Sequence, residues 1–263
     1  MGVENRTALV TGATSGIGEA IAEDLAAGGA RVAVAGRDAA RGRAVVERIR
    51  ERGGTAEFVT HESADPASAA AAVAATEAAL GPIDILVNNA GTMFFGPFTQ
   101  HPLESFETAV AVNLRGPYLL TQAVVPGMVE RRYGRVIFIS SNGARGGAAN
   151  TSLYALTKSG LEGLMRALTA EHAAEGLTFN TVQPGLVETP LTATMLSDQA
   201  MRERMAGFHP GGRVGIPQDI SHAVTMLADD AAGHFQNNII TVDGGLTTTI
   251  GYAVKEPPKE KIQ

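Results

Sequence analysis

Short apolar runs alternate along the chain with longer stretches rich in alanine and leucine, and this alternation constrains the fold most strongly. The runs carry no regular polar positions, as expected for strands that are buried on both faces of a parallel sheet. Helices between such strands cover both faces through right-handed crossovers. The strands are expected at Thr7–Thr11, Arg31–Ala35, Ala56–Thr60, Ile83–Val87, Arg135–Ser140, Thr178–Val182 and Ile239–Val242.

The stretches between these strands carry helical patterns. Helices are expected at Glu19–Ala27, Arg41–Arg52, Ala67–Leu80, from Leu103 through Val112, at Tyr154–Ala174 and at Gln218–Ala228. No internal repeat and no linker divides the chain, so residues 1–250 are predicted to form a single α/β domain. Its core is a Rossmann-type doubly wound parallel sheet of about seven strands with helices on both faces. Residues 251–263 are expected to form a polar C-terminal tail.

Composition excludes several classes of function. The 263 residues include 44% hydrophobic and 18% charged residues, as in an ordinary globular protein, and the net charge of −6 argues against a nucleic-acid partner. The absence of cysteine excludes disulfides and thiolate catalysis, and the six histidines lack the spacing of metal ligands, so no metal is expected. The apolar runs are too short to span a membrane and the N-terminus does not resemble a signal peptide, so a cytoplasmic location is expected.

The first strand is followed by a glycine-rich turn, TGATSGIG, over residues 11–18. Gly12 would permit the tight turn, Gly16 the close approach of backbone to a phosphate, and Gly18 close packing of helix on strand. The helix N-terminus then offers free N–H groups to a pyrophosphate. The spacing GxxxGxG differs from the usual dinucleotide fingerprint, and no Lys-Ser/Thr follows to make a P-loop. The alternative is a set of glycines that simply ends a strand.

The end of the second strand reads Gly36-Arg37-Asp38, with Arg37 placed 19 residues after Gly18. At this position a carboxylate accepts from the ribose 2′-hydroxyl of NAD, whereas an arginine suits the 2′-phosphate of NADP. The sequence therefore favours NADP(H), with NAD(H) possible because Asp38 could turn inward. In isolation, Arg37 could equally be a solvated loop residue.

Tyr154 and Lys158 lie at i and i+4, which puts them on one face of a helix. A nearby ammonium favours the phenolate form, so Lys158 is expected to bring the Tyr154 pKa toward neutrality. Taken alone, the spacing favours a simpler interpretation, in which Tyr154 is a packed ring and Lys158 a solvated amine.

These motifs together resemble the short-chain dehydrogenase/reductase family, in its 3-oxoacyl reductase-like branch. The resemblance extends from about Thr7 to Gly245 and is carried by TGATSGIG, by Asn88-Asn89-Ala90-Gly91, by Tyr154-x-x-x-Lys158 and by Asp243-Gly244-Gly245. It implies that Tyr154 is the acid/base and Lys158 its electrostatic partner. Ser141, 13 residues before the tyrosine, would anchor the carbonyl oxygen in preference to Ser140. Asn113 would link the lysine to water in a proton relay.

The resemblance also implies the residues that bind the dinucleotide. Asp65 matches an acidic residue near the adenine, and the segment after Pro184 matches the one beside the carboxamide. The complete set is Gly12, Thr14, Ser15, Gly16, Ile17, Gly18, Arg37, Asp65, Asn89, Ala90, Gly91, Tyr154, Lys158, Pro184, Gly185, Val187 and Thr189.

The chemistry expected is reversible hydride transfer between a ketone and a secondary alcohol, on a free, small and fairly apolar substrate. Residues 189–213, with Met195, Met201 and Met205 at helix-like intervals, are expected to form a substrate lid. A 3-oxoacyl reductase acting on a carrier protein is the alternative: the acidic Glu175 weighs against it, but Arg131 and Arg132 could serve for docking.

A dinucleotide-binding sensor or scaffold without catalysis is a third hypothesis, which the retained tyrosine and lysine disfavour. The resemblance to the dehydrogenase/reductase family also implies self-association, because related enzymes of that family are commonly homodimers or homotetramers. The identity of the substrate, its stereochemistry and the direction of reaction are not contained in the sequence.

Overall fold

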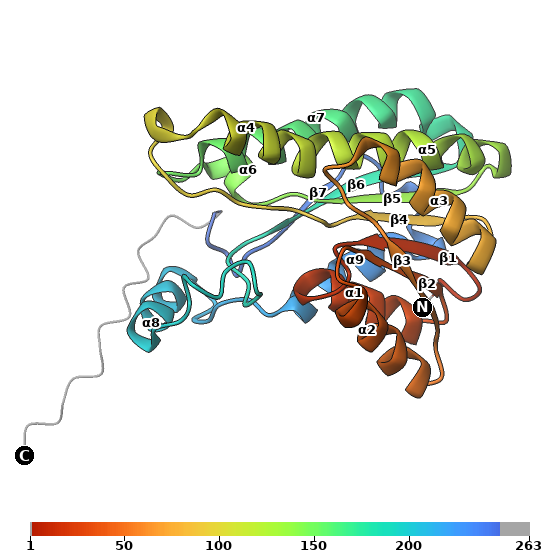
Figure 1. Cartoon of the computed structure of the whole chain (residues 1–263), viewed down its shortest axis with the longest axis horizontal. Helices are drawn as coiled ribbons and strands as arrows, with labels where there is room; N and C mark the ends of the chain where they lie inside the picture. The colour runs from red at the N-terminus through yellow and green to blue at the C-terminus, as the bar shows by residue number, and fades with distance from the viewer. Residues whose placement is uncertain (1, 248–263) are drawn as a thin grey trace, which may run out of the picture.

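The computed structural model describes residues 2–247, so the tail expected at residues 251–263 lies outside the described part of the chain. Its centre is one parallel sheet with the strand order β3-β2-β1-β4-β5-β6-β7 (Figure 1). The order reverses between β1 and β4, which creates the switch point where ligands bind in doubly wound sheets. The strands are β1 (Thr7–Thr11), β2 (Arg31–Gly36), β3 (Thr55–Thr60), β4 (Ile85–Asn88), β5 (Gly134–Ile139), β6 (Leu177–Pro184) and β7 (Ile239–Val242).

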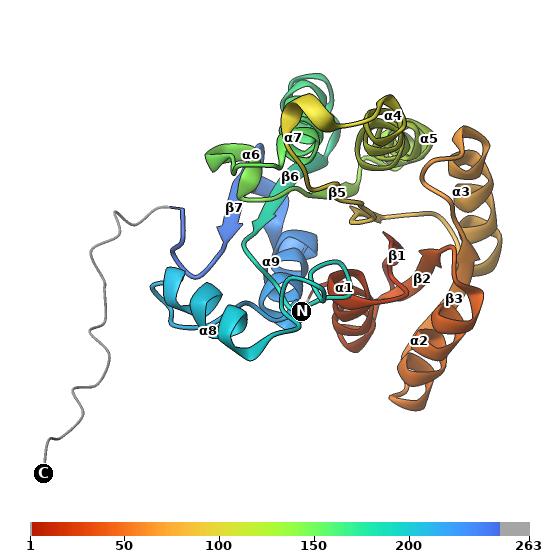
Figure 2. The same cartoon turned by 60° about the vertical axis from the view of Figure 1, so that its left-hand side comes forward.

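Helices cover both faces of this sheet (Figure 2), which confirms the predicted fold class. One face packs against α1 (Gly16–Ala27), α2 (Ala39–Glu51) and α9 (Pro217–Ala228). The other packs against α3 (Pro66–Leu80), α5 (Gly116–Arg131) and α7 (Ser152–His172). Consecutive strand residues alternate between the two cores: Ala8 and Val10 belong to the first, and Leu9 to the second.

The helix expected from Leu103 onward differs in detail from the prediction. It starts as α4 (Leu103–Val110), widens into one π-helical turn (Ala111–Arg115) and continues as α5. Single π turns inside longer helices are rare and occur mostly at functional sites. The periodicity of apolar residues does not reveal this turn, because the helical face continues on both sides of it.

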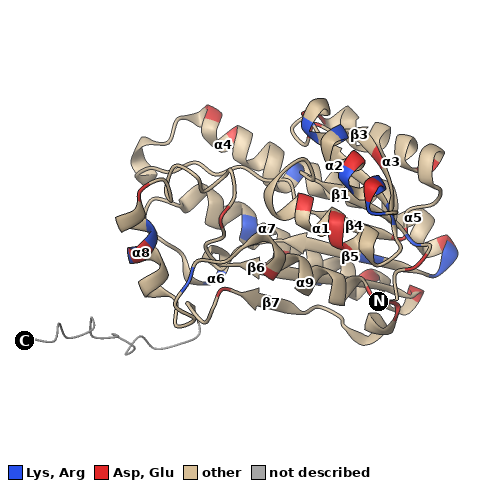
Figure 3. Ribbon diagram, turned by 90° about the horizontal axis from the view of Figure 1, so that it is seen from below, with Lys and Arg blue, Asp and Glu red and all other residues tan. Residues whose placement is uncertain are grey.

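Only part of the predicted lid is helical. The segment 191–198 forms turns, and α8 begins at Gln199 and ends at Phe208. The Asp198 side chain accepts a hydrogen bond from the Ala200 N–H at 3.2 Å and so marks the start of the helix. Basic and acidic residues lie side by side on α8, as they do on α2 (Figure 3). A short helix, α6 (Gly143–Gly146), follows β5.

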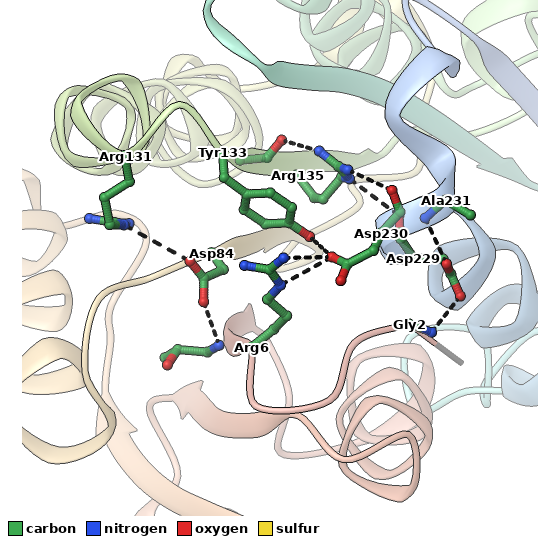
Figure 4. A network of polar contacts seen from close by, with 11 residues as sticks. Gly2, Arg6, Asp84, Arg131, Tyr133, Arg135, Asp229, Asp230 and Ala231 are labelled. Atoms are coloured by element: carbon green, nitrogen blue, oxygen red, sulfur yellow. Dashed lines mark hydrogen bonds and ion pairs between the residues drawn. The ribbon is translucent and has the colours of Figure 1, made fainter.

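A polar network closes the amino-terminal edge of the sheet (Figure 4). The Tyr133 ring lies between two guanidinium groups, with Arg6 3.7 Å and Arg135 4.4 Å from its centroid. Its hydroxyl donates to Asp230 at 2.7 Å. Burial and this hydrogen bond raise the pKa of Tyr133 well above its usual value. The network thus ties the starts of β1 and β5 to the turn that follows α9.

Arg131 and Arg132 also lie at this amino-terminal edge. Arg131 donates to the Ile83 carbonyl at 2.7 Å, and Arg132 donates to the Ala174 carbonyl at 3.1 Å. Both arginines are therefore a full strand length of β5 away from the edge where Ser141 lies. Among the helices of residues 2–247, none is sufficiently long and apolar to span a bilayer.

Candidate active site

A cavity of about 460 Å³ lies at the carboxyl edge of the sheet, where β1 and β4 diverge. It runs from the end of β2 to the start of α7 and gathers most of the residues that the sequence had singled out. Its walls include Gly12, Thr14, Ser15, Gly16, Ile17, Arg37, Asn89, Ala90, Gly91, Ser141, Tyr154, Lys158, Pro184, Gly185, Val187 and Thr189. The predicted residues Gly18, Asp65 and Asn113 do not line it.

The glycine-rich turn forms the floor of the cavity. Gly12 and Gly16 have φ of 62° and 59°, in the left-handed region that favours glycine. A methyl group at Gly18 would lie 2.4 Å from the Gly12 carbonyl oxygen, so only glycine allows α1 to pack this close to the turn. Ser15 occupies the N-cap of α1 without capping it through its side chain. The first N–H groups of the helix therefore face the cavity free of a side-chain cap.

Asn89 holds this turn from below. Its Nδ2 donates to the carbonyls of Thr11 at 2.8 Å and Gly12 at 3.3 Å. In return, the Thr11 hydroxyl accepts from the N–H groups of Asn89 at 3.0 Å and Ala90 at 3.1 Å. These bonds join the ends of β1 and β4, which fixes the shape of the cavity without any ligand.

Two arginines flank the far end of the cavity. Arg37 is largely exposed, and its guanidinium lies 3.4 Å from the Glu62 carboxylate. Arg41, which the sequence reasoning missed, also lines the cavity. Asp38 also lines the cavity, but its carboxylate is already bonded: it is the N-cap of α2, and it accepts from the Arg41 N–H at 3.0 Å and from the Arg41 guanidinium at 2.6 Å. These bonds hold the pKa of Asp38 below its usual value.

Asp65 lies elsewhere than the resemblance implied. It is the N-cap of α3, where its carboxylate accepts from the Ala67 N–H at 3.0 Å, and it does not border the cavity. Glu62 and Ser63 occupy the wall near the expected position. An acidic residue followed directly by proline at the first helical position is itself an N-cap signal. That signal, read from Asp65-Pro66, could have assigned the residue to the helix start.

Tyr154 borders the cavity from the first turn of α7, with Ser141 facing it from the end of β5. Burial raises the pKa of the Tyr154 hydroxyl to about 12, while a hydrogen bond with the Ser141 side chain works in the opposite direction. The Ser141 hydroxyl also accepts from the Gly143 N–H at 3.0 Å. Ser140, the other candidate serine, points away from Tyr154, toward Glu162 on α7. The structure thus brings Ser141, and not Ser140, beside the phenol.

Lys158 is only 3% exposed, and its ammonium donates to the Ile139 carbonyl at 2.7 Å. Burial lowers its pKa to about 8. The ammonium nitrogen lies 5.6 Å from the centroid of the Tyr154 ring. The expectation that Lys158 brings the Tyr154 pKa toward neutrality is wrong for the protein without ligand, because the loss of hydration on burial raises that pKa and the hydrogen bond with Ser141 opposes the rise only in part.

Asn113 lies in the π turn and is completely buried. Its amide makes a matched pair of bonds with the Thr92 backbone: it accepts from the N–H and donates to the carbonyl, both at 2.8 Å. A methyl group added at Gly91 would lie 3.3 Å from the Lys158 ammonium and 3.5 Å from the Asn113 amide oxygen, so both side chains pack against that glycine. Asn113 therefore fixes the loop that follows β4 beside Lys158.

The wall opposite Tyr154 is formed by the segment after β6. A methyl group at Gly185 would lie 2.7 Å from the Asp243 side chain, so this loop packs directly on the one after β7. The Thr192 hydroxyl donates to the Val187 carbonyl at 2.6 Å and accepts from the Thr189 N–H at 3.1 Å. These bonds hold residues 187–192 as a compact turn at the cavity mouth. Within residues 2–247, no cluster of three or more histidine or acidic side chains is arranged to hold a metal ion.

Comparison with known proteins identifies the fold and its site together. The model of the family described as enoyl-(acyl carrier protein) reductase matches residues 12–247, which include the glycine turn, Ser141, Tyr154 and Lys158. The chain belongs to the short-chain dehydrogenase/reductase family. It is therefore an oxidoreductase that acts on CH–OH groups or the corresponding carbonyls with a nicotinamide cofactor.

Relatives within this dehydrogenase/reductase family act on different substrates. The chain is 39% identical to the L-rhamnose 1-dehydrogenase (NAD(P)(+)) of Azotobacter vinelandii, over 92% of this chain and 96% of that protein. It is 35% identical to the 3-oxoacyl-[acyl-carrier-protein] reductase FabG of Escherichia coli, over 94% and 99% of the two chains. Among solved structures, a gluconate 5-dehydrogenase from Burkholderia cenocepacia in complex with NADP and tartrate superposes with a TM-score of 0.89. That match has 32% identity and covers 94% of this chain and 97% of the other.

Proposed function

We propose that the protein is an NADP(H)-dependent enzyme that interconverts a ketone and a secondary alcohol, with a free, small and fairly apolar substrate. The observation that carries the proposal is the pairing of the Ser141 and Tyr154 hydroxyls at the cavity wall, with the Lys158 ammonium beneath them. Two hydroxyl donors converging on one point suit a carbonyl oxygen that gains negative charge.

The cavity fits a dinucleotide. Free N–H groups at the start of α1 suit a pyrophosphate, and the left-handed glycines leave the backbone open to it. When bound, the cofactor supplies or accepts the hydride, and the protein orients the reactants and handles one proton. The residues proposed to hold it are those of the cavity wall already named, from Gly12 to Thr189.

The preference for NADP(H) rests on charge at the far end of the cavity. Arg37 and Arg41 both reach this end, and Asp38 is engaged as the cap of α2. A 2′-phosphate would thus meet two guanidinium groups, which bind phosphate oxygens strongly. The Asp38 carboxylate already accepts two bonds from Arg41 and is therefore a weaker partner for a ribose 2′-hydroxyl, so NAD(H) is expected to bind more weakly.

The protonation states of Tyr154 and Lys158 suit reduction of a ketone. With a pKa of about 12, the Tyr154 hydroxyl stays protonated at neutral pH and can donate to an oxygen that becomes negatively charged. Lys158, with a pKa of about 8, is mostly cationic at neutral pH. Its charge beneath the ring stabilises the phenolate that remains after the proton has left. Ser141 holds the substrate oxygen next to the phenol, and Asn113 keeps the loop beside Lys158 in place.

A free substrate is favoured over a carrier-bound one by the position of the basic residues. The two arginines considered for carrier docking, Arg131 and Arg132, are bonded to backbone carbonyls at the opposite edge of the sheet. The end of α7 offers His172 next to Glu171 and Glu175, which is an unfavourable surface for an acidic carrier. Residues 189–213 are proposed to cover the substrate, with Met195, Met201 and Met205 providing adaptable apolar contacts.

The test is a screen of NADPH oxidation and NADP reduction over a panel of ketones and alcohols, with NAD(H) and an acyl-carrier substrate run in parallel. Tyr154→Phe is expected to bind NADPH nearly as well as the wild type and to lose turnover. Activity in this variant above about a few per cent would disprove the role of Tyr154. Much faster turnover of the carrier-bound substrate would favour the 3-oxoacyl reductase. Tight NADPH binding without any turnover would favour a sensor.

Self-association is part of the proposal. A mainly apolar groove of about 400 Å³ lies between α5 and α7, and Tyr118 beside it is 48% exposed. Apolar surface of this kind is commonly covered by a second subunit. We expect a homodimer or homotetramer, and light scattering that gives a monomer mass would exclude it.

A further inference from the structure

Glu162 is a buried carboxylate that none of the proposed chemistry uses. It lies one helical turn after Lys158 on α7, only 8% exposed, with the core residues Leu161 and Met165 as neighbours on the same face. Burying an ionised carboxylate is costly unless several hydrogen bonds compensate, and an apolar side chain would pack this face at lower cost. The presence of an acid here therefore calls for a specific partner.

One oxygen of Glu162 provides two such bonds. Its Oε1 accepts from the Ser140 hydroxyl at 2.8 Å and from the Gln183 amide at 2.6 Å. The Ser140 and Gln183 side chains are each 1% exposed, so both bonds are sheltered from water. Gln183 in turn accepts from the Thr241 hydroxyl at 3.0 Å. A single carboxylate thus connects α7 to the carboxyl ends of β5 and β6 and, through Gln183, to β7.

Each strand that it holds leads directly into the site. Ser140 precedes Ser141, and Gln183 precedes the Pro184-Gly185 wall of the cavity. Backbone bonds, such as the one from the Ser140 N–H to the Val182 carbonyl at 2.8 Å, fix β5 against β6. They do not fix either strand against α7, which carries Tyr154.

The contacts between α7 and the end of β5 are few. The Lys158 ammonium reaches the Ile139 carbonyl at 2.7 Å, and the Ser140 hydroxyl lies 3.2 Å from the Lys158 carbonyl. Glu162 supplies the remaining bond, which the Ser140 hydroxyl donates to a carboxylate oxygen at 2.8 Å. Glu162 therefore contributes directly to how rigidly Ser140 and Ser141 are held against the helix.

We propose that Glu162 is a positioning residue of the reaction: by holding Ser140 and Gln183 against α7, it sets the separation between the Ser141 and Tyr154 hydroxyls. This inference rests on the proposed roles of Ser141 and Tyr154. Glu162 itself lies outside the cavity wall, so it acts through its neighbours and touches no reactant.

The position of Ser141 has a measurable signature. The hydrogen bond from Ser141 opposes the rise in the Tyr154 pKa that burial causes. If Ser141 moves away, the pKa of Tyr154 rises further, and the acid/base pKa seen in the pH profile moves upward. A purely structural role of Glu162 would lower stability without this change.

The experiment compares Glu162→Ala, Glu162→Gln and Ser140→Ala with Glu171→Gln, a matched control because Glu171 is an exposed acid on the same helix. Four quantities are measured: the unfolding temperature, the Kd of NADPH, the single-turnover rate with a ketone from the panel, and its isotope effect with 4-deuterated NADPH. The pH profile of the rate is recorded for each protein.

Glu162→Ala is expected to slow hydride transfer by about 10- to 100-fold, because a misplaced donor loses its alignment with the substrate oxygen. Its isotope effect should rise, its pH profile should move upward, and its Kd for NADPH should stay within about twofold of the wild type. Glu162→Gln keeps an oxygen acceptor and should recover most of the rate. The double variant Ser140→Ala/Glu162→Ala should be no slower than Glu162→Ala alone, since Ser140 acts through its bond to Glu162, which the single variant already removes.

An unchanged rate in Glu162→Ala overturns the proposal, as does a loss of rate matched by an equal loss of NADPH binding. If Glu162→Ala does not fold, the proposal is tested on Ser140→Ala, which must then show both the loss of rate and the altered pH profile. A normal pH profile in Ser140→Ala overturns the proposal. A failure of the proposed function can be distinguished from a failure of the Glu162 proposal. The former would appear as absent turnover in the wild type, or as retained turnover in Tyr154→Phe.

Discussion

Replacing Lys158 by methionine should make the protein more stable and inactive. The ammonium is 3% exposed, and burial lowers its pKa from 10.5 to about 8. Below pH 8 the lysine is cationic in both the folded and the unfolded chain, so the folded state carries the full cost of desolvation. Between pH 8 and 10.5 the unfolded chain binds a proton that the folded chain does not, so stability increases with pH.

The size of the effect follows from the two pKa values. Their difference corresponds to about 3 kcal/mol of unfolding free energy at pH 7. Lys158→Met also leaves the Ile139 carbonyl without its donor, which costs about 1–3 kcal/mol. The net gain at pH 7 is therefore at most about 2 kcal/mol. The change of stability with pH tests the desolvation separately from the lost hydrogen bond: between pH 7 and 10 the wild type should gain about 2–3 kcal/mol relative to the variant.

The assay is equilibrium unfolding in urea of both proteins without cofactor, at several pH values from about 7 to 10. Other titrating groups are common to the two proteins and cancel in the difference. If the unfolding free energies of the wild type and the variant change in parallel between pH 7 and 10, the account of Lys158 as a desolvated ammonium is refuted. A variant that retains turnover would refute its electrostatic role, whatever the stability shows.

Three further changes test other parts of the molecule. Arg41→Ala should weaken binding of NADP by about 10-fold while leaving NAD nearly unaffected, as measured by calorimetry, because one guanidinium contact with a phosphate is lost. Gly18→Ala brings a methyl group to 2.4 Å from the Gly12 carbonyl oxygen. It should lower the unfolding free energy by about 1–3 kcal/mol and abolish NADPH binding. Tyr133→Phe removes the bond to Asp230 at 2.7 Å. It should cost about 1–2 kcal/mol in urea unfolding and leave turnover unchanged.

The five inner strands were predictable because they are buried on both faces, which leaves a continuous apolar run in the sequence. Their ends were less so, since they depend on partners that are distant along the chain. The strand expected at Thr178–Val182 extends to Pro184 because Gln183 and Pro184 pair with Thr241 and Val242 of β7. The π turn at Asn113 was hidden for the same reason: it is stabilised by Thr92, from another element.

The parts of the site that belong to a motif, such as the glycine turn and the side chains of Ser141, Tyr154 and Lys158, were predictable, and the side chains outside any motif were not. The glycine turn is a local device, so its residues reveal it directly. Arg41 and Glu162 have no motif of their own: the first reaches the cavity only because α2 starts at Ala39, and the second because α7 packs across β5 and β6. Asp65 shows the opposite error, in which a residue matched by type turned out to cap a helix.

The two edges of the sheet serve different purposes: the carboxyl edge carries the candidate active site, and the amino edge carries a network that stabilises the fold. The carboxyl edge holds a desolvated ammonium and a π turn, which are costly or rare features that occur frequently at functional sites. The amino edge instead holds a satisfied network in which Tyr133 is packed between Arg6 and Arg135. Lys158→Met and Tyr133→Phe should therefore change the unfolding free energy in opposite directions. Lys158→Met should raise it and abolish turnover, whereas Tyr133→Phe should lower it and leave turnover unchanged. Because the two residues lie at opposite edges and share no partner, their effects on unfolding should add in the double variant.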